Sequence, residues 1–153
     1  MITQLNGRLV SKTPTTLVID CGGVGYEVHI SLHTFGQLPE DEHIRIYTHH
    51  QVREDAQTLY GFIAQVERSV FRLLVSVSGI GANTARTMLS SMTPHDVVQA
   101  IQSDNVAAIQ SVKGIGAKTA QRVIVDLSDK VTGLLDEGEI STTSNNTQRD
   151  EAL

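Results

Sequence analysis

Two short glycine-rich turns are the residues of this sequence whose type and spacing best suit chemistry with a ligand. The stretch SVSGIGANTA (residues 76–85) returns 35 residues later as SVKGIGAKTA (residues 111–120). Glycine lets a foreign backbone approach closely, and the first N–H groups of a following helix point outward at the positive end of its dipole. A phosphate oxygen satisfies such donors directly. The repeat therefore predicts two phosphate-binding turns, suited to a long phosphate backbone.

Packing and side-chain charge support this interpretation of the turns. The isoleucine between each pair of glycines can pack back between the flanking helices and fix their angle. Lys118 and Arg122 follow the second turn, and Arg86 follows the first, so each turn has a cation nearby. Because backbone donors read no base, we expect binding that is independent of nucleotide sequence.

Three other interpretations of the turns stay open at this level. A dinucleotide-binding turn needs a preceding strand and a glycine or alanine at its sixth position, where Thr84 and Thr119 stand here. A Walker loop needs Gly-Lys before Ser or Thr, and Ala117 occupies that glycine position. The turns could also be structural helix–turn–helix corners without a ligand. Duplication of the whole cassette favours nucleic acid over all three.

Charge is distributed unevenly along the chain, whose net charge is −5. Residues 1–62 carry a net charge of −3, residues 63–133 carry +2, and residues 134–153 carry −4. The two turns thus lie in the net-basic block, which suits a polyanionic partner. The absence of tryptophan and the low aromatic content argue against large base-stacking platforms.

Composition also bears on the compartment. A hydrophobic fraction of 40% is ordinary for a soluble protein with a core. The sequence contains no apolar run of the roughly 18 residues that a membrane helix needs, and its first residues lack a signal-peptide pattern. The single Cys21 cannot form an internal disulfide. We therefore expect a cytoplasmic protein in a reducing compartment, without a membrane partner.

Residues 1–62 are predicted to form an N-terminal OB-like antiparallel β-barrel. TTLVIDC and GYEVHIS alternate or run apolar, and glycines between them indicate a turn. About five short strands in this length are typical of a small barrel. An SH3-like barrel remains an alternative.

Residues 63–135 are predicted to form an all-α domain that contains two helix–hairpin–helix motifs. From Ala64 onward the apolar period changes from two to 3.6, and each glycine turn has a helix on both sides. The segment TPHD (residues 93–96) predicts a helix start, since threonine can cap and proline suits the first helical position. Ser103 is predicted to cap a further short helix that ends near Val112.

The motifs together resemble one known family. GVGYEV (residues 23–28), VREDAQTLYGF (residues 52–62) and the paired GIG turns are similar to the RuvA family, the Holliday-junction-binding subunits of the bacterial RuvAB branch-migration complex. The likeness runs from Met1 to about Gly133. The resemblance implies structure-specific, sequence-independent binding of four-way junctions in recombination and DNA repair, by a homotetramer or by two tetramers face to face.

The resemblance also assigns roles to residues. An acidic pin, here Glu54 and Asp55, reaches the junction centre and keeps crossing strands apart. Asn83 stands where the family commonly has lysine, so the first turn is expected to depend more on amides and on Arg86. The expected DNA-binding residues are Gly79, Ile80, Gly81, Asn83, Thr84 and Arg86 in the first turn, and Gly114, Ile115, Gly116, Lys118, Thr119 and Arg122 in the second.

Residues 136–153 are polar and acidic, and they are predicted to form a flexible linker. In the RuvA family a third, small helical domain follows and docks the hexameric motor ATPase RuvB. The sequence stops at residue 153, where that domain would begin, so we expect junction binding without normal recruitment of the motor. ATP would be used by that partner, and no cofactor is expected for this chain.

Other reactive side chains give no catalytic pattern. The six histidines and Cys21 lack the spacing of a structural zinc site and of a nucleophile with its base. We therefore expect no metal, no catalytic residue and no enzyme activity of the chain itself. Two rival functions remain. One is a non-catalytic hairpin module of another repair complex, which would prefer plain duplex; the other is a nucleotide-using enzyme, which would bind mononucleotides.

Overall fold

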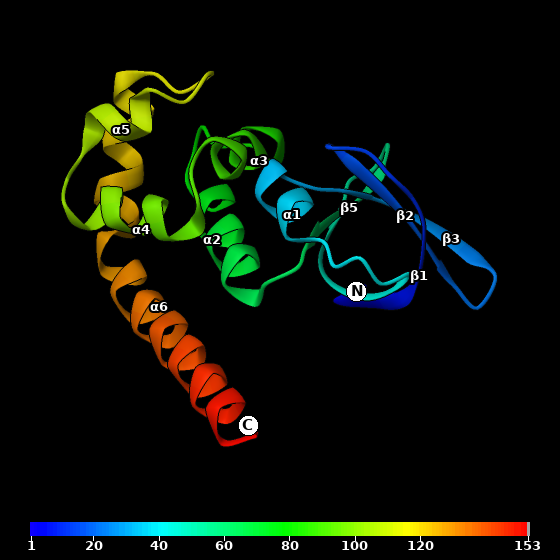
Figure 1. Cartoon of the computed structure of the whole chain (residues 1–153). Helices are drawn as coiled ribbons and strands as arrows, with labels where there is room; N and C mark the ends of the chain where they lie inside the picture. The colour runs from blue at the N-terminus through cyan, green and yellow to red at the C-terminus, as the bar shows by residue number, and fades with distance from the viewer. Residues whose placement is uncertain (153) are drawn as a thin grey trace.

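The computed structural model describes the backbone of residues 1–152 and the side chains of residues 1–134. A barrel is followed by a bundle of helices, beyond which the last helix extends (Figure 1). The strands are β1 (Gln4–Lys12), β2 (Thr16–Cys21), β3 (Val24–His29), β4 (His43–Val52) and β5 (Gln57–Phe62). The helices are α1 (Leu32–Gln37), α2 (Gln65–Val75), α3 (Ala82–Ser91), α4 (Pro94–Gln102), α5 (Val106–Gln110) and α6 (Ala117–Ala152).

The five strands close into a barrel in the order β1-β2-β3-β5-β4. The pairs are antiparallel, except that β3 and β5 meet in parallel where His29 lies opposite Tyr60. The period-two pattern of β2 puts Leu17 and Ile19 inside the barrel, where neither is exposed to solvent. The predicted small barrel of short strands is confirmed.

Helix α1 lies in a region where the sequence pattern predicts strands and turns alone. Ser31 caps it, because its Oγ accepts a hydrogen bond of 3.1 Å from the backbone N–H of Thr34. The helix ends at Leu38, whose N–H donates to the carbonyl of Phe35. Six residues make fewer than two helical turns, so a 3.6-residue period cannot emerge from so short a segment.

The predicted start of α4 is confirmed as a capping box. Thr93 Oγ1 accepts from the backbone N–H of Asp96 at 3.1 Å, and the carboxylate of Asp96 accepts from the N–H of Thr93 at 3.3 Å. The cap predicted at Ser103 is wrong, because Asn105 caps α5 and Ser103 ends α4. Between them Asp104 has a φ of 54°, which reverses the chain and moves the cap two residues onward.

An aromatic cluster joins the barrel to the helices. Phe71 of α2 is fully buried. The centroid of its ring lies 5.2 Å from the ring centroid of Tyr60 and 5.0 Å from that of Phe62, and both of these residues are on β5. His49 of β4 packs edge-on against the same ring at 5.3 Å. Helix α2 is thus held on the barrel by apolar contacts that link the two parts of the chain.

Helix α6 buries an apolar stripe at helical spacing, from Ala120 through Val123 and Leu127 to Val131. The backbone then continues as helix to Ala152, whereas a flexible linker is expected over residues 136–153. After Pro94 the sequence contains no proline that would stop the helix. The side chains of residues 135–153 lie outside the described part, so the packing and mobility of the linker remain a prediction.

Candidate nucleic-acid interface

The two glycine turns have the same local geometry. Gly79 and Gly114 have φ angles of 98° and 93°, which residues other than glycine rarely adopt. In the first turn, Ile80 N–H donates to the Val77 carbonyl at 3.1 Å. In the second, Ile115 N–H donates to the Val112 carbonyl at 3.2 Å. The sequence repeat is therefore also a repeat of backbone conformation.

The helix that follows each turn begins in the same way. Ala85 N–H donates to Gly81 O, and Ala120 N–H donates to Gly116 O, each at 3.0 Å. The amides before these first bonds have no partner within the helix. Gly81 is the N-cap of α3 and provides no side-chain cap. The first amides of α3 thus have no helical or side-chain cap partner, and α6 begins with the same sequence pattern.

Burial separates the candidate DNA-binding residues into two groups. Ile80 and Ile115 are buried at 4% and 5% exposure, so they pack between the helices as predicted. The turn glycines and the polar side chains at the helix starts are exposed or half-buried. This second group comprises Gly79, Gly81, Asn83 and Thr84 in the first turn, and Gly114, Gly116, Lys118, Thr119 and Arg122 in the second.

The two turns lie against each other. A Cβ atom at Gly79 would be 3.5 Å from Oγ1 of Thr119, at the start of α6. Residues that are 40 positions apart in the sequence therefore form one continuous surface. Lys118 and Arg122 are exposed on it, and within the described part of the chain neither side chain has a hydrogen bond or ion pair.

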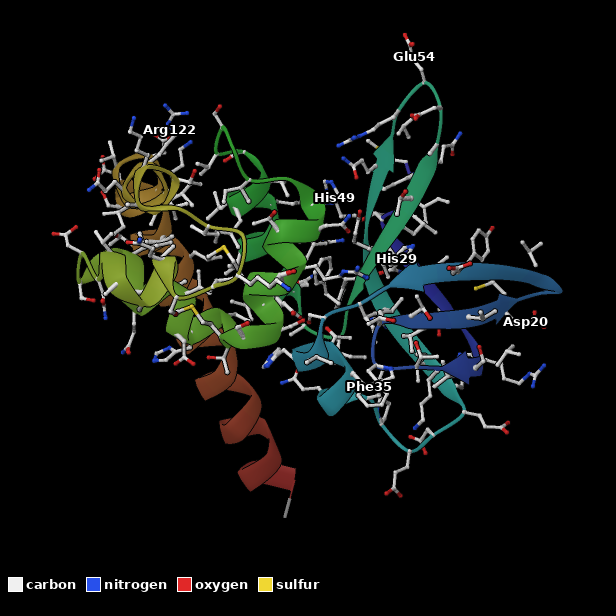
Figure 2. The ribbon with its side chains drawn as sticks, turned by 90° about the horizontal axis from the view of Figure 1, so that it is seen from above. Asp20, His29, Phe35, His49, Glu54 and Arg122 are labelled. Carbon is white, nitrogen blue, oxygen red and sulfur yellow. The ribbon has the colours of Figure 1, made fainter. Side chains whose placement is uncertain are left out.

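The predicted acidic pin forms the tip of the β4–β5 hairpin. Arg53 N–H donates to the Ala56 carbonyl at 2.8 Å and closes the turn, so Glu54 and Asp55 stand at its end. Both acids are exposed, and among residues 1–134 neither has an ion-pair partner. Figure 2 shows Glu54 at the far end of the hairpin, projecting toward the same edge of the molecule as Arg122.

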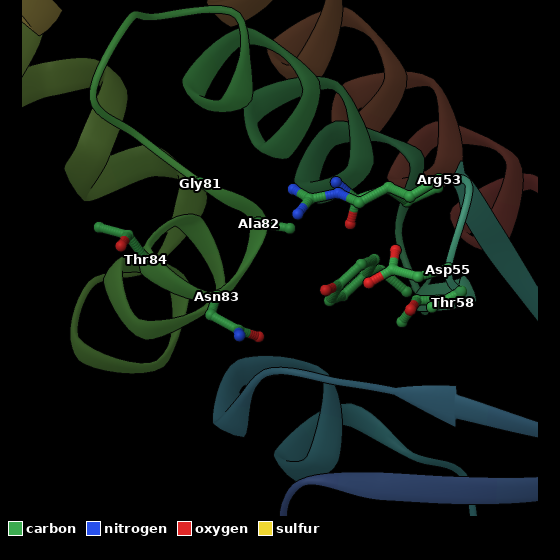
Figure 3. Close-up of a pocket in the computed structure, with 10 residues that line it drawn as sticks. Arg53, Asp55, Thr58, Gly81, Ala82, Asn83 and Thr84 are labelled. Carbon is green, nitrogen blue, oxygen red and sulfur yellow. The ribbon is translucent and has the colours of Figure 1, made fainter.

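A groove of about 330 Å³ separates this acidic tip from the first glycine turn. Arg53 and Asp55 lie on the hairpin side and face Ala82 and Asn83 at the start of α3 (Figure 3). The complete lining is Gln51, Arg53, Asp55, Ala56, Thr58, Tyr60, Gly81, Ala82, Asn83 and Thr84. The structure thus places Asp55 of the tip across the groove from the first turn, which sequence spacing alone does not show.

Arg86 and Arg53 differ from what the sequence suggests. One guanidinium nitrogen of Arg86 lies 3.3 Å from the Thr15 carbonyl and 3.3 Å from His29 Nδ1, so this side chain is attached to the barrel. Its role at a phosphate stays a prediction. Arg53 lines the groove but was not among the expected ligands, and its position beside two acids in the motif was the available signal.

The described residues contain neither a metal-binding cluster nor a membrane-spanning helix. They contain no group of three or more histidine, cysteine, aspartate or glutamate side chains that could hold a metal ion. Their helices include none that is both long and apolar enough to cross a membrane.

Comparison with family models places both parts of the chain. Residues 1–61 match the RuvA N-terminal domain, and residues 71–129 match the SAM-like helix-hairpin-helix tandem.

Curated relatives agree with these matches. The chain is 57% identical over all 153 residues to the Holliday junction branch migration complex subunit RuvA of Christiangramia forsetii, and it covers 79% of that protein. It is 54% identical, with the same coverage, to the protein of that name from Flavobacterium psychrophilum. The protein of the same name from Shewanella denitrificans is 44% identical over 137 residues, which are 89% of this chain and 68% of that protein. With its five-stranded barrel, twin hairpin turns and these relatives, the chain belongs to the RuvA family.

Proposed function

We propose that this chain binds four-way DNA junctions without base specificity, as the non-catalytic subunit of a branch-migration complex in recombination and repair. The observation that carries the proposal is the pairing of two unlike surfaces. The twin turns lie against each other and carry exposed cations, and the first of them lies across a groove from an exposed acidic tip. The first surface suits phosphates, and the second repels them.

The turns would hold the DNA arms. Amides at the starts of α3 and α6 donate to phosphate oxygens, and Lys118 and Arg122 add positive charge. Because the two turns lie against each other, they would hold phosphates of one backbone together. The expected ligands are those of the two exposed turns, while Ile80 and Ile115 support them from below.

The acidic tip would act at the crossover. Like charges repel by about 1 kcal/mol at about 4 Å in bulk water, and by about 4 kcal/mol where the effective dielectric constant is about 20. Glu54 and Asp55 therefore oppose close approach of phosphates at the point where strands exchange. Strands leaving that point are directed away from the tip and along the basic turns, which holds the junction open.

Assembly follows from the same proposal. A four-way junction has four arms, so a homotetramer, or two tetramers face to face, would present one pair of turns to each arm. The names of the relatives place those proteins in a branch migration complex. We extend this to the present chain, with an ATP-dependent motor of the RuvB type as partner and the bacterial cytoplasm as the compartment.

A gel-shift comparison tests the function. The chain is titrated against a four-way junction and against linear duplex of identical base content, and the complexes are sized by light scattering. We expect tighter binding of the junction by at least about tenfold, or 1.4 kcal/mol, in a complex that contains several copies of the chain. Equal affinity for both substrates would instead identify a general hairpin module for duplex DNA.

A further inference from the structure

Glu67 is a buried carboxylate that the proposed DNA contacts do not use. It lies in the first turn of α2 and has no exposure to solvent. One carboxylate oxygen accepts from Ser31 Oγ at 2.5 Å, and the other accepts from Thr34 Oγ1. Burying an acid is costly unless hydrogen bonds satisfy it, so this arrangement requires both hydroxyls. Since both come from α1 and its cap, Glu67 ties the helical bundle to the barrel.

Two further side chains make bonds in the same region. Ser90 Oγ of α3 accepts from the backbone N–H of Leu32 at 3.0 Å and donates to the Arg86 carbonyl at 3.0 Å. Arg86 reaches the Thr15 carbonyl and His29, as described above. We call this set of contacts the seam. It consists of Glu67, Arg86 and Ser90 from the helices, and Thr15, His29, Ser31, Leu32 and Thr34 from the barrel and α1.

The seam serves one hairpin unit and not the other. Helices α2 and α3 flank the first glycine turn, and both carry seam residues. In the second unit, 35 positions later, the corresponding side chains are Gln102, Gln121 and Val125, and all three are exposed. The main contacts of α5 and α6, among the elements described, are with other helices. Of the two turns, therefore, the first is the one whose flanking helices are hydrogen-bonded to the barrel that carries the acidic tip.

We propose that Glu67 is a positioning residue: held by Ser31 and Thr34, it sets the spacing between the first glycine turn and the acidic tip, and that spacing produces the preference for branched DNA. The inference rests on the proposed function for its DNA readout. A linear duplex needs the turns alone. A junction needs the turns to hold an arm while the tip lies at the crossover, so it is sensitive to their separation.

The first experiment compares Glu67→Ala with the full-length parent chain on both DNA substrates. We expect affinity for the junction to fall about tenfold, while affinity for duplex stays within about twofold. Glu67→Gln keeps the size of the side chain and one carbonyl acceptor, so it should restore most of the ratio between the two affinities. Thr34→Val, which removes one donor at nearly constant volume, should give an intermediate ratio and serves if Glu67→Ala does not fold.

Two control variants separate positioning from general stability. Gln102→Ala changes the exposed side chain at the corresponding offset and should leave the ratio unchanged. Ile19→Ala opens a cavity inside the barrel at a residue that makes none of the seam hydrogen bonds, and it should lower thermal stability without changing the ratio. The proposal is overturned if Glu67→Ala weakens both substrates by the same factor, or if Ile19→Ala lowers the ratio equally.

A second experiment needs no DNA. Spin labels are attached to Ala56→Cys at the tip and Ser78→Cys in the first turn, in a Cys21→Ser background diluted with unlabelled chain. We expect one narrow distance distribution in the parent and a broader or shifted one after Glu67→Ala. An unchanged distribution would overturn the positioning role. If the parent shows no preference for junctions, the proposed function fails, while this measurement still tests the seam.

Discussion

The first and second hairpin units share a backbone and differ in their surroundings. Both turns use glycine at a φ near 95° and bury an isoleucine between two helices. The first turn faces the acidic tip across a groove and is attached to the barrel, whereas the second carries Lys118 and Arg122 and contacts mainly other helices. The comparison indicates a division of work. Under the proposed function, the second unit would supply charge, and the first would relate the DNA arm to the crossover.

The largest expected effect comes from removing the feature that both units share. Valine at Gly79 and Gly114 would force a side chain into a left-handed backbone conformation, which costs about 1–3 kcal/mol at each turn. We expect the double variant to lose binding to junction and duplex alike, by about 100-fold in titrations at moderate salt. Each single variant should lose less than the double. If the double variant binds normally, the turns are structural corners without a ligand.

Removing the lysine of the second unit, or adding one to the first, should have the next largest effect. Lys118→Ala should weaken binding to all base sequences equally. It should also make the fall of log affinity with log salt less steep, by about 0.9 in the slope. Asn83→Lys should make the first unit resemble the second, and it should make the salt dependence steeper by about the same amount. Salt titrations of both variants measure this. A loss restricted to one DNA sequence would contradict contact through phosphates.

Neutralising the acidic tip should change geometry more than affinity. We expect Glu54→Gln with Asp55→Asn to leave junction affinity unchanged or to tighten it, because a repulsive term is removed. Fluorescence energy transfer between arm ends should then show a junction that is less open than with the parent. Loss of binding in this variant would show that the tip holds DNA and does not repel it.

The smallest effect concerns pH and the seam. Burial raises the pKa of Glu67 above its usual range, against the lowering effect of the hydrogen bonds from Ser31 and Thr34 and of nearby His33. The folded state therefore holds this proton more tightly than the unfolded state does. Its stabilising contribution is fully present below the unfolded pKa and is lost as the pH rises through the folded pKa.

Thermal melts of the parent and of Glu67→Gln across mildly acidic to neutral pH test this sign. The parent should lose more stability than the variant as the pH rises, since glutamine carries no titrating proton. The difference between the two melting temperatures should then be constant at higher pH. If the two curves run parallel throughout, Glu67 does not titrate in this range.

Local patterns in the sequence predicted a large part of this protein. The alternation of β2, the helix start at Thr93, the helical period after Ala64 and the twin turns all depend on residues within a few positions of each other. Where the prediction failed, the segment was too short or the chain reversed abruptly. Helix α1 is too short to show a period, and the φ of Asp104 moved the expected cap from Ser103 to Asn105.

The sequence by itself determined the repeated turn, its net-basic block and the acidic motif, because glycine conformation, helix starts and charge are properties of neighbouring residues. Only the tertiary structure decided what each turn faces. Glu67 meets Ser31 across 36 positions, and Arg86 meets His29 across 57. Such contacts arise when the barrel and the bundle bury their apolar surfaces against each other. An exposed acid and a buried one look the same in a sequence, and only the folded structure shows that Glu54 and Asp55 are exposed while Glu67 is buried.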